Sequence, residues 1–466
     1  MDDSFSTSPR DTAMNSPVFN RRAFLKSATA ASLTSSLLAK STLAQVAASD
    51  KVTLGFIGAG KQASVLLPEF VKLPGFQVVA VCDVDQTRRD ATQKRVNALY
   101  SQMKSAPAQG CVSYRDFREL LAHPDLDAVV VATPDHWHAP AVIAAAQADK
   151  DIYCEKPLCE TVLEGQAMTR AIRDHKRIFQ TGSMQRSAPA FRWAAELVRG
   201  GVLGKIDRVH AGFGGPARPC NLPAEDLEPG LDWKMWLGPA PERPYNSVLS
   251  PRGMHTHYPM WRRYWEYGGG GVTDWGAHHV DITQWALGMD QSGPVKVIPA
   301  DNPLQAQSGG KLIYGNGIEV THVPDNGITF FGNQGELFTK RGEFKLTLNG
   351  KVVADYKFPV SGATDESAEL NQKVTALARE LLGSKQPQLQ ESTNHYANFL
   401  SSIHSRQDPI CPVEVGAHTV NACHLLNFSY RYGEKVEWDP VRQNFINGTG
   451  KPEWLTREYS ADWKVV

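Results

Sequence analysis

Residues 58–63, Gly-Ala-Gly-Lys-Gln-Ala, directly follow an apolar run from Val52 to Ile57 and precede a helical pattern. This is the G-x-G-x-x-A form of a dinucleotide-binding turn. Gly58 permits a tight turn, Gly60 lets the backbone approach a pyrophosphate, and Ala63 lets helix and strand pack closely. The sequence therefore predicts a strand, a glycine turn and a helix whose N-terminus binds the phosphates of a dinucleotide.

A second predicted strand, Phe76–Cys82, ends at Asp83. A carboxylate at this strand end is placed to bind the hydroxyls of the adenosine ribose, and it would repel a 2′-phosphate. We therefore expect NAD rather than NADP. Arg88 and Arg89 follow closely and keep NADP open, and a cap on a helix starting at Gln86 is the alternative role for Asp83.

Two more motifs follow predicted strands of the same region. One is Thr133-Pro134-Asp135-His136-Trp137-His138 and the other is Glu155-Lys156-Pro157. Ligands of open α/β sheets bind beyond the carboxyl ends of strands, so both motifs should border the cofactor. We expect Thr133, Pro134, His138, Glu155 and Lys156 to contact it. In the second half of the chain, residues 268–278 read Gly-Gly-Gly-Gly-Val-Thr-Asp-Trp-Gly-Ala-His.

In their order and spacing these motifs resemble the Gfo/Idh/MocA family, named for glucose–fructose oxidoreductase and inositol dehydrogenase. The resemblance implies a Rossmann domain followed by an α/β domain with a large, mostly antiparallel sheet, and an active site between them. It also implies a catalytic triad of Lys156, Asp274 and His278. Glu155 and Pro157 would shape a turn, with a cis peptide bond before Pro157.

The chemistry of the three side chains suits the oxidation of a sugar hydroxyl. His278 could accept the hydroxyl proton because an imidazole titrates near neutrality. Lys156 could stabilise the developing alkoxide. If residues 274–278 are helical, Asp274 lies on the same face as His278 and could fix the imidazole tautomer, or it could cap a helix running to Leu287. We expect no bound metal, because Asp274, His278, His279 and Asp281 do not match a zinc-binding spacing.

Residues 254–267 are rich in aromatic side chains that could stack on a sugar. We predict substrate contacts for Tyr258, Trp261, Arg262 and Tyr264; a packed loop between domains is the equally weighted alternative. Gln185 and Arg186 could also face the nicotinamide, and His395 could approach the site or cap its helix. Residues 233–239 look like a structural plug without a chemical role.

The intervening sequence alternates predicted strands and helices, which favours a doubly wound parallel sheet over residues 50–180. The predicted helices there are Asp90–Met103, Tyr114–Leu121, His138–Ala148 and Thr161–His175, and the strands are Ala128–Ala132, Ile152–Cys154 and Ile178–Gln180. Residues 181–466 form the predicted α/β substrate and oligomerisation domain. Its expected elements include the strands Ile328–Phe331, Glu336–Thr339 and Phe344–Leu348 and the helices Asn394–His404 and Val413–Tyr432.

Residues 1–49 resemble a twin-arginine export leader, with Asn20-Arg21-Arg22-Ala23-Phe24-Leu25-Lys26 followed by a weakly apolar stretch. An amphipathic helix is the alternative. The twin-arginine route carries folded proteins, so a noncovalent cofactor would bind before export. We therefore expect a periplasmic protein that keeps its cofactor and has the export machinery as a partner.

Composition excludes several classes of protein. The 49 basic and 49 acidic residues balance, which argues against nucleic acid as the main partner. Outside the leader there is no long apolar run for a membrane span, and the seven cysteines form no C-x-x-C pair. The expected function is transfer of hydride between a tightly bound nicotinamide cofactor and a sugar hydroxyl. A redox-neutral NAD-dependent glycosidase is the rival, and a dimer or tetramer is the expected assembly.

Overall fold

The protein is described by a computed structural model that covers residues 51–103, 110–360, 367–385 and 389–465. The predicted export leader, residues 1–49, lies outside the described residues. The seven cysteines all lie within the described part of the chain and form no disulfide. Across these residues, no helix combines the length and the apolar character that crossing a lipid bilayer requires.

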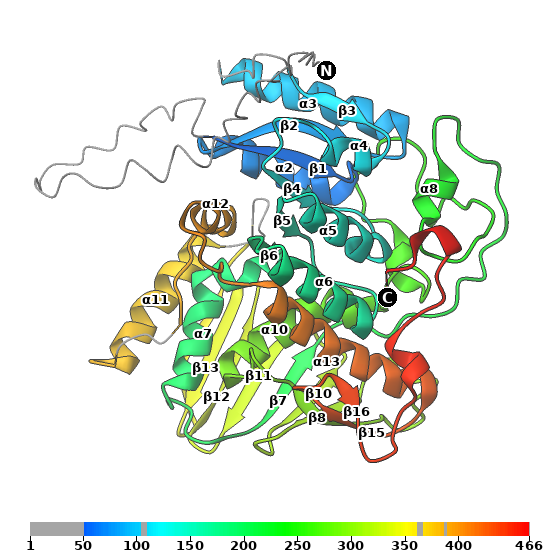
Figure 1. Cartoon of the computed structure of the whole chain (residues 1–466). Coiled ribbons are helices and arrows are strands. Elements are labelled where there is room, and N and C mark those ends of the chain that lie inside the picture. The colour runs from blue at the N-terminus through cyan, green and yellow to red at the C-terminus, as the bar shows by residue number, and fades with distance from the viewer. Residues whose placement is uncertain (1–50, 104–109, 361–366, 386–388, 466) are drawn as a thin grey trace, which may run out of the picture. The chain divides into compact units, whose positions relative to one another are not determined.

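The N-terminal half forms a six-stranded parallel sheet in the order β3-β2-β1-β4-β5-β6, flanked by helices (Figure 1). The predicted doubly wound sheet is thus confirmed, and its order reverses between β1 and β4, where open α/β sheets bind ligands. The strands are β1 (Val52–Ile57), β2 (Phe76–Cys82), β3 (Val112–Tyr114), β4 (Ala128–Val131), β5 (Asp151–Cys154) and β6 (Phe179–Thr181). The helices are α2 (Lys61–Lys72), α3 (Gln86–Gln102), α4 (Phe117–Leu121), α5 (His138–Gln147) and α6 (Val162–Asp174), with the short 3₁₀ helices η2 (Asp135–Trp137) and η3 (Met184–Ser187).

Two predicted helices of this half are wrong in extent. Helix α3 begins at Gln86 rather than Asp90, because the Asp85 side chain accepts a hydrogen bond from the Arg88 backbone N–H and caps the helix there. The segment predicted as helix from Tyr114 starts instead as the end of edge strand β3, and only Phe117–Leu121 is helical. A three-residue strand is too short to show an alternating pattern.

The second half contains a ten-stranded sheet in the order β14-β13-β12-β11-β7-β10-β9-β8-β15-β16. Its neighbours pair antiparallel except β7 and β10, as the resemblance implied. The strands are β7 (Ile206–Gly212), β8 (Pro294–Ile298), β9 (Lys311–Tyr314), β10 (Glu319–Val323), β11 (Gly327–Gly332), β12 (Gly335–Lys340), β13 (Glu343–Leu348), β14 (Lys351–Lys357), β15 (Val436–Asp439) and β16 (Asn444–Phe445).

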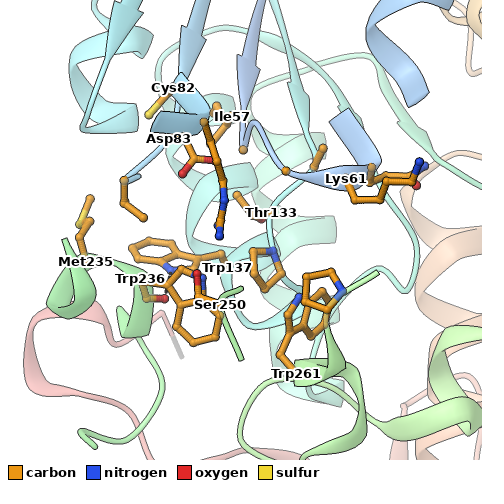
Figure 2. Close-up of a pocket in the computed structure, with 18 of the residues that line it drawn as sticks. Ile57, Lys61, Cys82, Asp83, Thr133, Trp137, Met235, Trp236, Ser250 and Trp261 are labelled. Atoms are coloured by element: carbon orange, nitrogen blue, oxygen red, sulfur yellow. Dashed lines mark hydrogen bonds between the residues drawn. The ribbon is translucent and has the colours of Figure 1, made fainter. Parts of the chain in front are cut away.

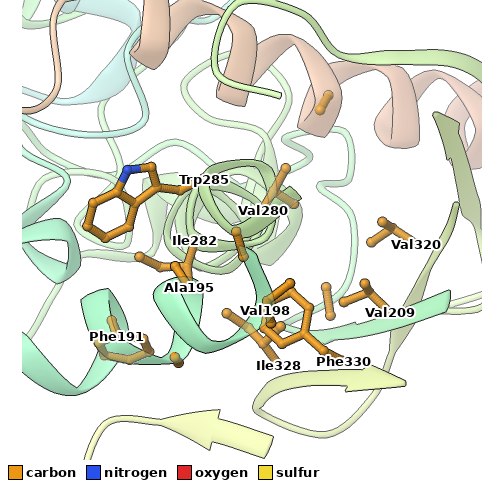
Figure 3. Packing of buried hydrophobic residues seen from close by; sticks show 14 of the residues in the cluster. Phe191, Ala195, Val198, Val209, Val280, Ile282, Trp285, Val320, Ile328 and Phe330 are labelled. Carbon is orange, nitrogen blue, oxygen red and sulfur yellow. The ribbon is translucent and has the colours of Figure 1, made fainter. Parts of the chain in front are cut away.

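Helices cover one face of this sheet (Figure 1). Figure 3 shows Phe191 and Val198 of α7 and Ile282 of α10 packed over Val209 and Phe330 of the strands beneath. This contact removes the apolar faces of both helices from water and fixes the position of α10. The helices are α7 (Pro189–Arg199), α8 (Trp233–Leu237), α9 (Gly270–Asp274), α10 (Gly276–Leu287), α11 (Ala368–Leu382), α12 (His395–Ser405) and α13 (Val413–Tyr432), with the 3₁₀ helices η4 (Met260–Arg263), η5 (Pro452–Leu455) and η6 (Ala461–Trp463).

The second half of the chain also packs back into the Rossmann half. Tyr396 of α12 lies with its ring 4.9 Å from that of Phe70 in α2, and both side chains are buried. The backbone N–H of Thr181 in β6 donates to the carbonyl of Cys411, just before α13. These contacts hold the two sheets in a fixed relation, so residues from both can form one site.

Candidate active site

A cavity lies at the carboxyl ends of β1, β2 and β4. Gly58, Gly60, Asp83 and Thr133 are among the residues that line it. Figure 2 shows that Asp83 and Thr133 reach it from the Rossmann sheet, whereas Met235, Trp236 and Trp261 reach it from the segment between β7 and α9. The cavity is therefore enclosed by both halves of the chain.

The glycine turn has the geometry that a dinucleotide requires. Gly58 has φ +92°, and a Cβ there would lie 2.8 Å from the carbonyl of Ala132. Gly60 lines the cavity at the start of α2, and a Cβ on it would meet no described atom within 4 Å. Ala63 is buried against the strand. The space over Gly60 and the free N-terminus of α2 fit a pyrophosphate.

Asp83 lines the cavity at the end of β2, as expected for a ribose ligand. Its carboxylate accepts hydrogen bonds from the backbone N–H groups of Ala59, at 2.7 Å, and Asp85, at 2.8 Å. Burial raises the pKa of this carboxyl, although Arg88 opposes the shift. Asp83 therefore stabilises the glycine turn. The helix cap, which was the alternative role considered for Asp83, is provided by Asp85.

The two arginines that left NADP open are both engaged by the protein. Arg88 is buried and donates to the carbonyls of Pro251 and Gly253. Both belong to residues 213–269, between β7 and α9, which form the covering segment of the cavity. Arg89 donates to the Asp83 carbonyl at 2.8 Å. The Arg88 contacts tie the covering segment to α3 at the Asp83 end of the cavity, which Arg88 itself also lines.

His138 connects the two motifs at the strand ends. Its Nδ1 lies 2.8 Å from the carbonyl of Pro157 and its Nε2 lies 3.2 Å from the carbonyl of Thr133. The ring is buried, which lowers its pKa to about 4, and it is not among the described residues that line the cavity. We infer that His138 positions the neighbouring segments. The Thr133 hydroxyl is buried in the cavity wall without a hydrogen-bond partner among the described residues, which leaves it available to a ligand.

Glu155 links the E-K-P turn to the glycine turn. Its carboxylate accepts from the Gln62 side chain at 3.0 Å, and Gln62 in turn accepts from the Tyr258 hydroxyl at 3.1 Å. Burial raises the pKa of Glu155, opposed chiefly by Lys156. The peptide bond between Lys156 and Pro157 is cis, as the resemblance implied. The E-K-P turn is thus fixed against α2 and the covering segment.

Lys156 and Asp274 meet across the two halves of the chain. The Lys156 ammonium donates to the Asp274 carboxylate at 2.6 Å and to its backbone carbonyl at 3.0 Å. The Arg262 guanidinium lies 3.8 Å from the same carboxylate. Burial alone would raise the pKa of Asp274, but Lys156 and Arg262 outweigh burial and lower it. The two side chains are 16% and 24% exposed, so a ligand can reach this ion pair.

His278 lies near this pair, but the predicted contact with Asp274 is wrong. Helix α9 ends at Asp274 and α10 begins at Gly276, so the segment is not one continuous helix, and Asp274 ends a helix rather than capping the start of one. The Arg341 guanidinium, from the turn between β12 and β13, lies 3.4 Å from His278 Nε2. Burial lowers the pKa of His278 well below its ordinary value, helped by Lys156 and Arg341, so the imidazole is neutral.

The position of Asp274 depends on a close backbone contact at the start of α9. The Gly270–Gly271 peptide packs directly against residues 214–216, which follow β7, and Gly270 forms an isolated antiparallel bridge with Pro216. A Cβ on Gly271 would clash with the backbone of Gly214. Only glycine permits this approach, which explains the run of glycines before Asp274.

We predict that Gly271→Ala displaces α9 and lowers both stability and turnover. Forcing one methyl into a packed contact should cost about 1–3 kcal/mol of the free energy of unfolding, measured by urea denaturation. Gly315→Ala is the matched control, because its Cβ would meet only Val295, at 3.7 Å. Equal stability of the two variants would show that the glycine contact does not hold α9.

The aromatic residues of segment 254–267 were predicted either to contact substrate or to form a packed loop, and the structure shows some in each position. Trp261 and Arg262 line the cavity, and Tyr258 is exposed at its edge over α2. Tyr264 is buried in a packed cluster and is not among the cavity-lining residues, so the packed-loop interpretation holds for it. The assignment of residues 233–239 as a plug without a chemical role missed that Met235 and Trp236 form part of the cavity wall. Their apolar pattern gave no signal for this, because packing and ligand contact require the same side chains.

Other candidates are engaged elsewhere. Arg186 is buried and pairs with Asp281 and Asp290 rather than facing the cofactor cavity. His395 contacts the Thr181 carbonyl and the Ser187 hydroxyl, so it neither caps α12 nor reaches the site. His279 contacts the Gly212 carbonyl and points away from His278. No group of three potential metal ligands is found among the residues with described positions.

Comparison with known families decides the assignment. Residues 52–183 match the family model described as oxidoreductase family, NAD-binding Rossmann fold, and residues 217–465 match the model for the C-terminal alpha/beta domain of the same family. The chain belongs to the Gfo/Idh/MocA oxidoreductase family. Its Rossmann half is therefore an NAD-binding domain, and the cavity beside Gly60 and Thr133 has the unfilled space and the free polar groups to hold that cofactor.

Relatives within the Gfo/Idh/MocA family have several activities. The chain is 29% identical over 165 residues to a glycosyl hydrolase family 109 protein of Shewanella baltica (strain OS155), a match spanning 35% of each protein. It is 31% identical over 222 residues to inositol 2-dehydrogenase of Acidothermus cellulolyticus, covering 45% of this chain and 61% of the relative. The structure of aldose-aldose oxidoreductase from Caulobacter crescentus in complex with glycerol shares the fold, with a TM-score of 0.55 at 19% identity over 83% of this chain and 99% of that one.

Proposed function

We propose that the protein transfers hydride between a bound nicotinamide dinucleotide and a hydroxyl group of a sugar or sugar derivative. The observation that carries this proposal is the accessible ion pair of Lys156 with Asp274 beside His278. Lys156 follows β5, so the pair lies at the same edge of the parallel sheet as the dinucleotide cavity. The similarity to an inositol dehydrogenase supports a polyol-type substrate. The cofactor, when bound, supplies the hydride acceptor.

In this mechanism each residue has one task. The Lys156 ammonium donates a hydrogen bond to the reacting hydroxyl and stabilises its developing negative charge. Asp274 orients Lys156 through two contacts, one made by its carboxylate and one by its backbone carbonyl. His278 holds the hydroxyl proton, since its imidazole is neutral and can accept one. Trp261 and Arg262 bind the remainder of the sugar, and Tyr258 closes the edge of the site.

We further propose that the cofactor is NAD and that it remains bound through turnover. Asp83 favours an unphosphorylated ribose, and Arg88 is held by carbonyls of the covering segment. That segment closes over the cavity with Met235, Trp236 and Ser250. A retained cofactor suits export by the twin-arginine machinery to the periplasm. It also requires a second substrate to restore the cofactor, an activity consistent with the similarity to an aldose-aldose oxidoreductase.

A redox-neutral glycosidase is the second candidate, favoured by the similarity to glycosyl hydrolase family 109 proteins. In that reaction removal of hydride would turn one carbon into a carbonyl, the neighbouring carbon would lose a proton to a base, and the next carbon would lose its leaving group with the bonding electrons. Water would add to the resulting double bond in the hydrolytic case, and hydride would return to the carbonyl. The same Lys156 and His278 would serve. The net product would be a hydrolysed or eliminated glycoside without change in the cofactor.

The experiment follows the reduced-nicotinamide absorbance of the purified protein while sugars, polyols and glycosides are added. Lasting reduction supports the oxidoreductase. Release of an aglycone without lasting reduction supports the glycosidase. Sugar binding with neither signal would contradict both proposals. Native mass spectrometry of the same sample reports whether the cofactor is retained and whether the protein is the dimer or tetramer that we propose.

A further inference from the structure

The imidazole of His278, the proposed base, has its described polar contact with an arginine. The Arg341 guanidinium Nη2 lies 3.4 Å from His278 Nε2, and the same group lies 5.0 Å from the centre of the Trp275 ring. Arg341 comes from the turn between β12 and β13, far from His278 in sequence, so only the fold brings the two together. The contact therefore belongs to the second domain rather than to the dinucleotide motifs.

This contact has a chemical consequence for the base. A guanidinium has only donors, so Nε2 must present its lone pair to Arg341, and the imidazole proton must be on Nδ1. The Nδ1 atom is buried without a hydrogen-bond partner among the described residues. While Arg341 remains there, the lone pair that should accept the hydroxyl proton is directed at a cation.

Charged groups of both signs surround Asp274, because the buried carboxyls of Asp135 and Glu155 interact with Lys156 and Arg262 as well. Lys156, Arg262 and Arg341 all lower the pKa of Asp274, which shows that three cationic side chains act on one carboxylate. Two of these cations, Arg262 and Arg341, are arginines, whose planar guanidinium groups match the geometry of carboxylate and phosphate.

We propose that the substrate is an anionic sugar derivative whose carboxylate or phosphate binds Arg341, draws the guanidinium from His278 Nε2, and so frees the base. This inference rests on the proposed hydride transfer. The hydroxyl then loses its proton to Nε2 and its carbon loses a hydride, with both electrons, to oxidised NAD, which leaves a carbonyl. A substrate without the anion leaves Arg341 on the imidazole and reacts slowly.

Calorimetric binding to the holoenzyme tests the first half of the inference. The anionic probes are glucuronate, gluconate and glucose 6-phosphate, and their neutral counterparts are glucose and sorbitol. We expect at least one anion to bind about tenfold or more tighter than its counterpart, and Arg341→Gln to bring the ratio within about threefold. Whether the carboxylates or the phosphate bind identifies the anion.

The matched control is Lys340→Gln, which removes one positive charge from the end of β12, next to the turn that carries Arg341. Lys340 pairs with Glu343 and makes no described contact with His278. This variant should keep the wild-type ratio. Unchanged binding of the neutral sugar by Arg341→Gln shows that the variant folds. Equal binding of anions and neutral sugars by the wild type, or an undiminished ratio in Arg341→Gln, would overturn the inference.

The second readout is the pKa of His278, measured by NMR on protein with labelled histidine and assigned with His278→Gln. The charged groups that act on His278 are Lys156, Arg341 and the neighbouring His279. A bound anion should raise this pKa in the wild type and leave it unchanged in Arg341→Gln. This response does not require turnover, so its absence overturns the inference, whereas its presence without hydride transfer would count against the proposed function alone.

Discussion

Replacing Lys156 by alanine should reduce hydride transfer by about 10³-fold or more and leave the dinucleotide bound. The expected size follows from the loss of one preorganised donor to the developing alkoxide, which alone costs about 10²–10³ in rate. Asp274 would then lose its 2.6 Å partner and keep Arg262, at 3.8 Å, as its one ion-pair partner among the described residues. The measurement is the rate of nicotinamide reduction at saturating substrate.

Lys72→Ala provides the control for this variant. Lys72 ends α2 on the surface with 67% of its side chain exposed, and within the described part of the chain its one ion pair is with Glu69. It should keep the wild-type rate. Cofactor content measured by mass spectrometry separates a chemical defect from loss of the dinucleotide. A Lys156→Ala protein that reduces its cofactor at the wild-type rate would remove this residue from the mechanism.

The parts of the site that could be predicted from sequence are those fixed by local rules. The carboxyl ends of parallel strands meet at one edge, so the motifs after β1, β4 and β5 had to lie close together. Helix α13 spans Val413–Tyr432 as predicted, since a long helix that ends before Gly433 gives clear boundaries. Short edge strand β3 and the Asp85 cap were missed because neither produces a periodic pattern.

The parts that could not be predicted depend on distant contacts. Arg341 reaches His278 only because β12 and β13 have a particular register within a ten-stranded sheet. The close backbone contact of Gly271 with Gly214 at the start of α9, and the break after Asp274 at its end, are not indicated by local propensity. The spacing of four residues also suggested a contact between Asp274 and His278. In the structure Asp274 instead contacts Lys156, and His278 contacts Arg341.

A buried ion pair anchors the helix that carries His278. Arg186 of η3 contacts both carboxylate oxygens of Asp281 and also binds Asp290, and its guanidinium lies over the Trp285 ring. Arg186 and Asp281 are each 1% exposed. Asp281 is three residues after His278 on α10, so this pair fixes the turn of helix that presents the base.

We expect Arg186→Met to lower the free energy of unfolding by about 3–5 kcal/mol, measured by urea denaturation, because Asp281 would remain buried without its charged partner. Arg442→Met is the control: its side chain is 83% exposed and lies 3.8 Å from Asp439, so about 0–1 kcal/mol should be lost. Adding Asp281→Leu to Arg186→Met should restore part of the stability, because the stranded charge is removed. If the double variant is no more stable than Arg186→Met, the loss comes from packing around Trp285 rather than from the buried charge.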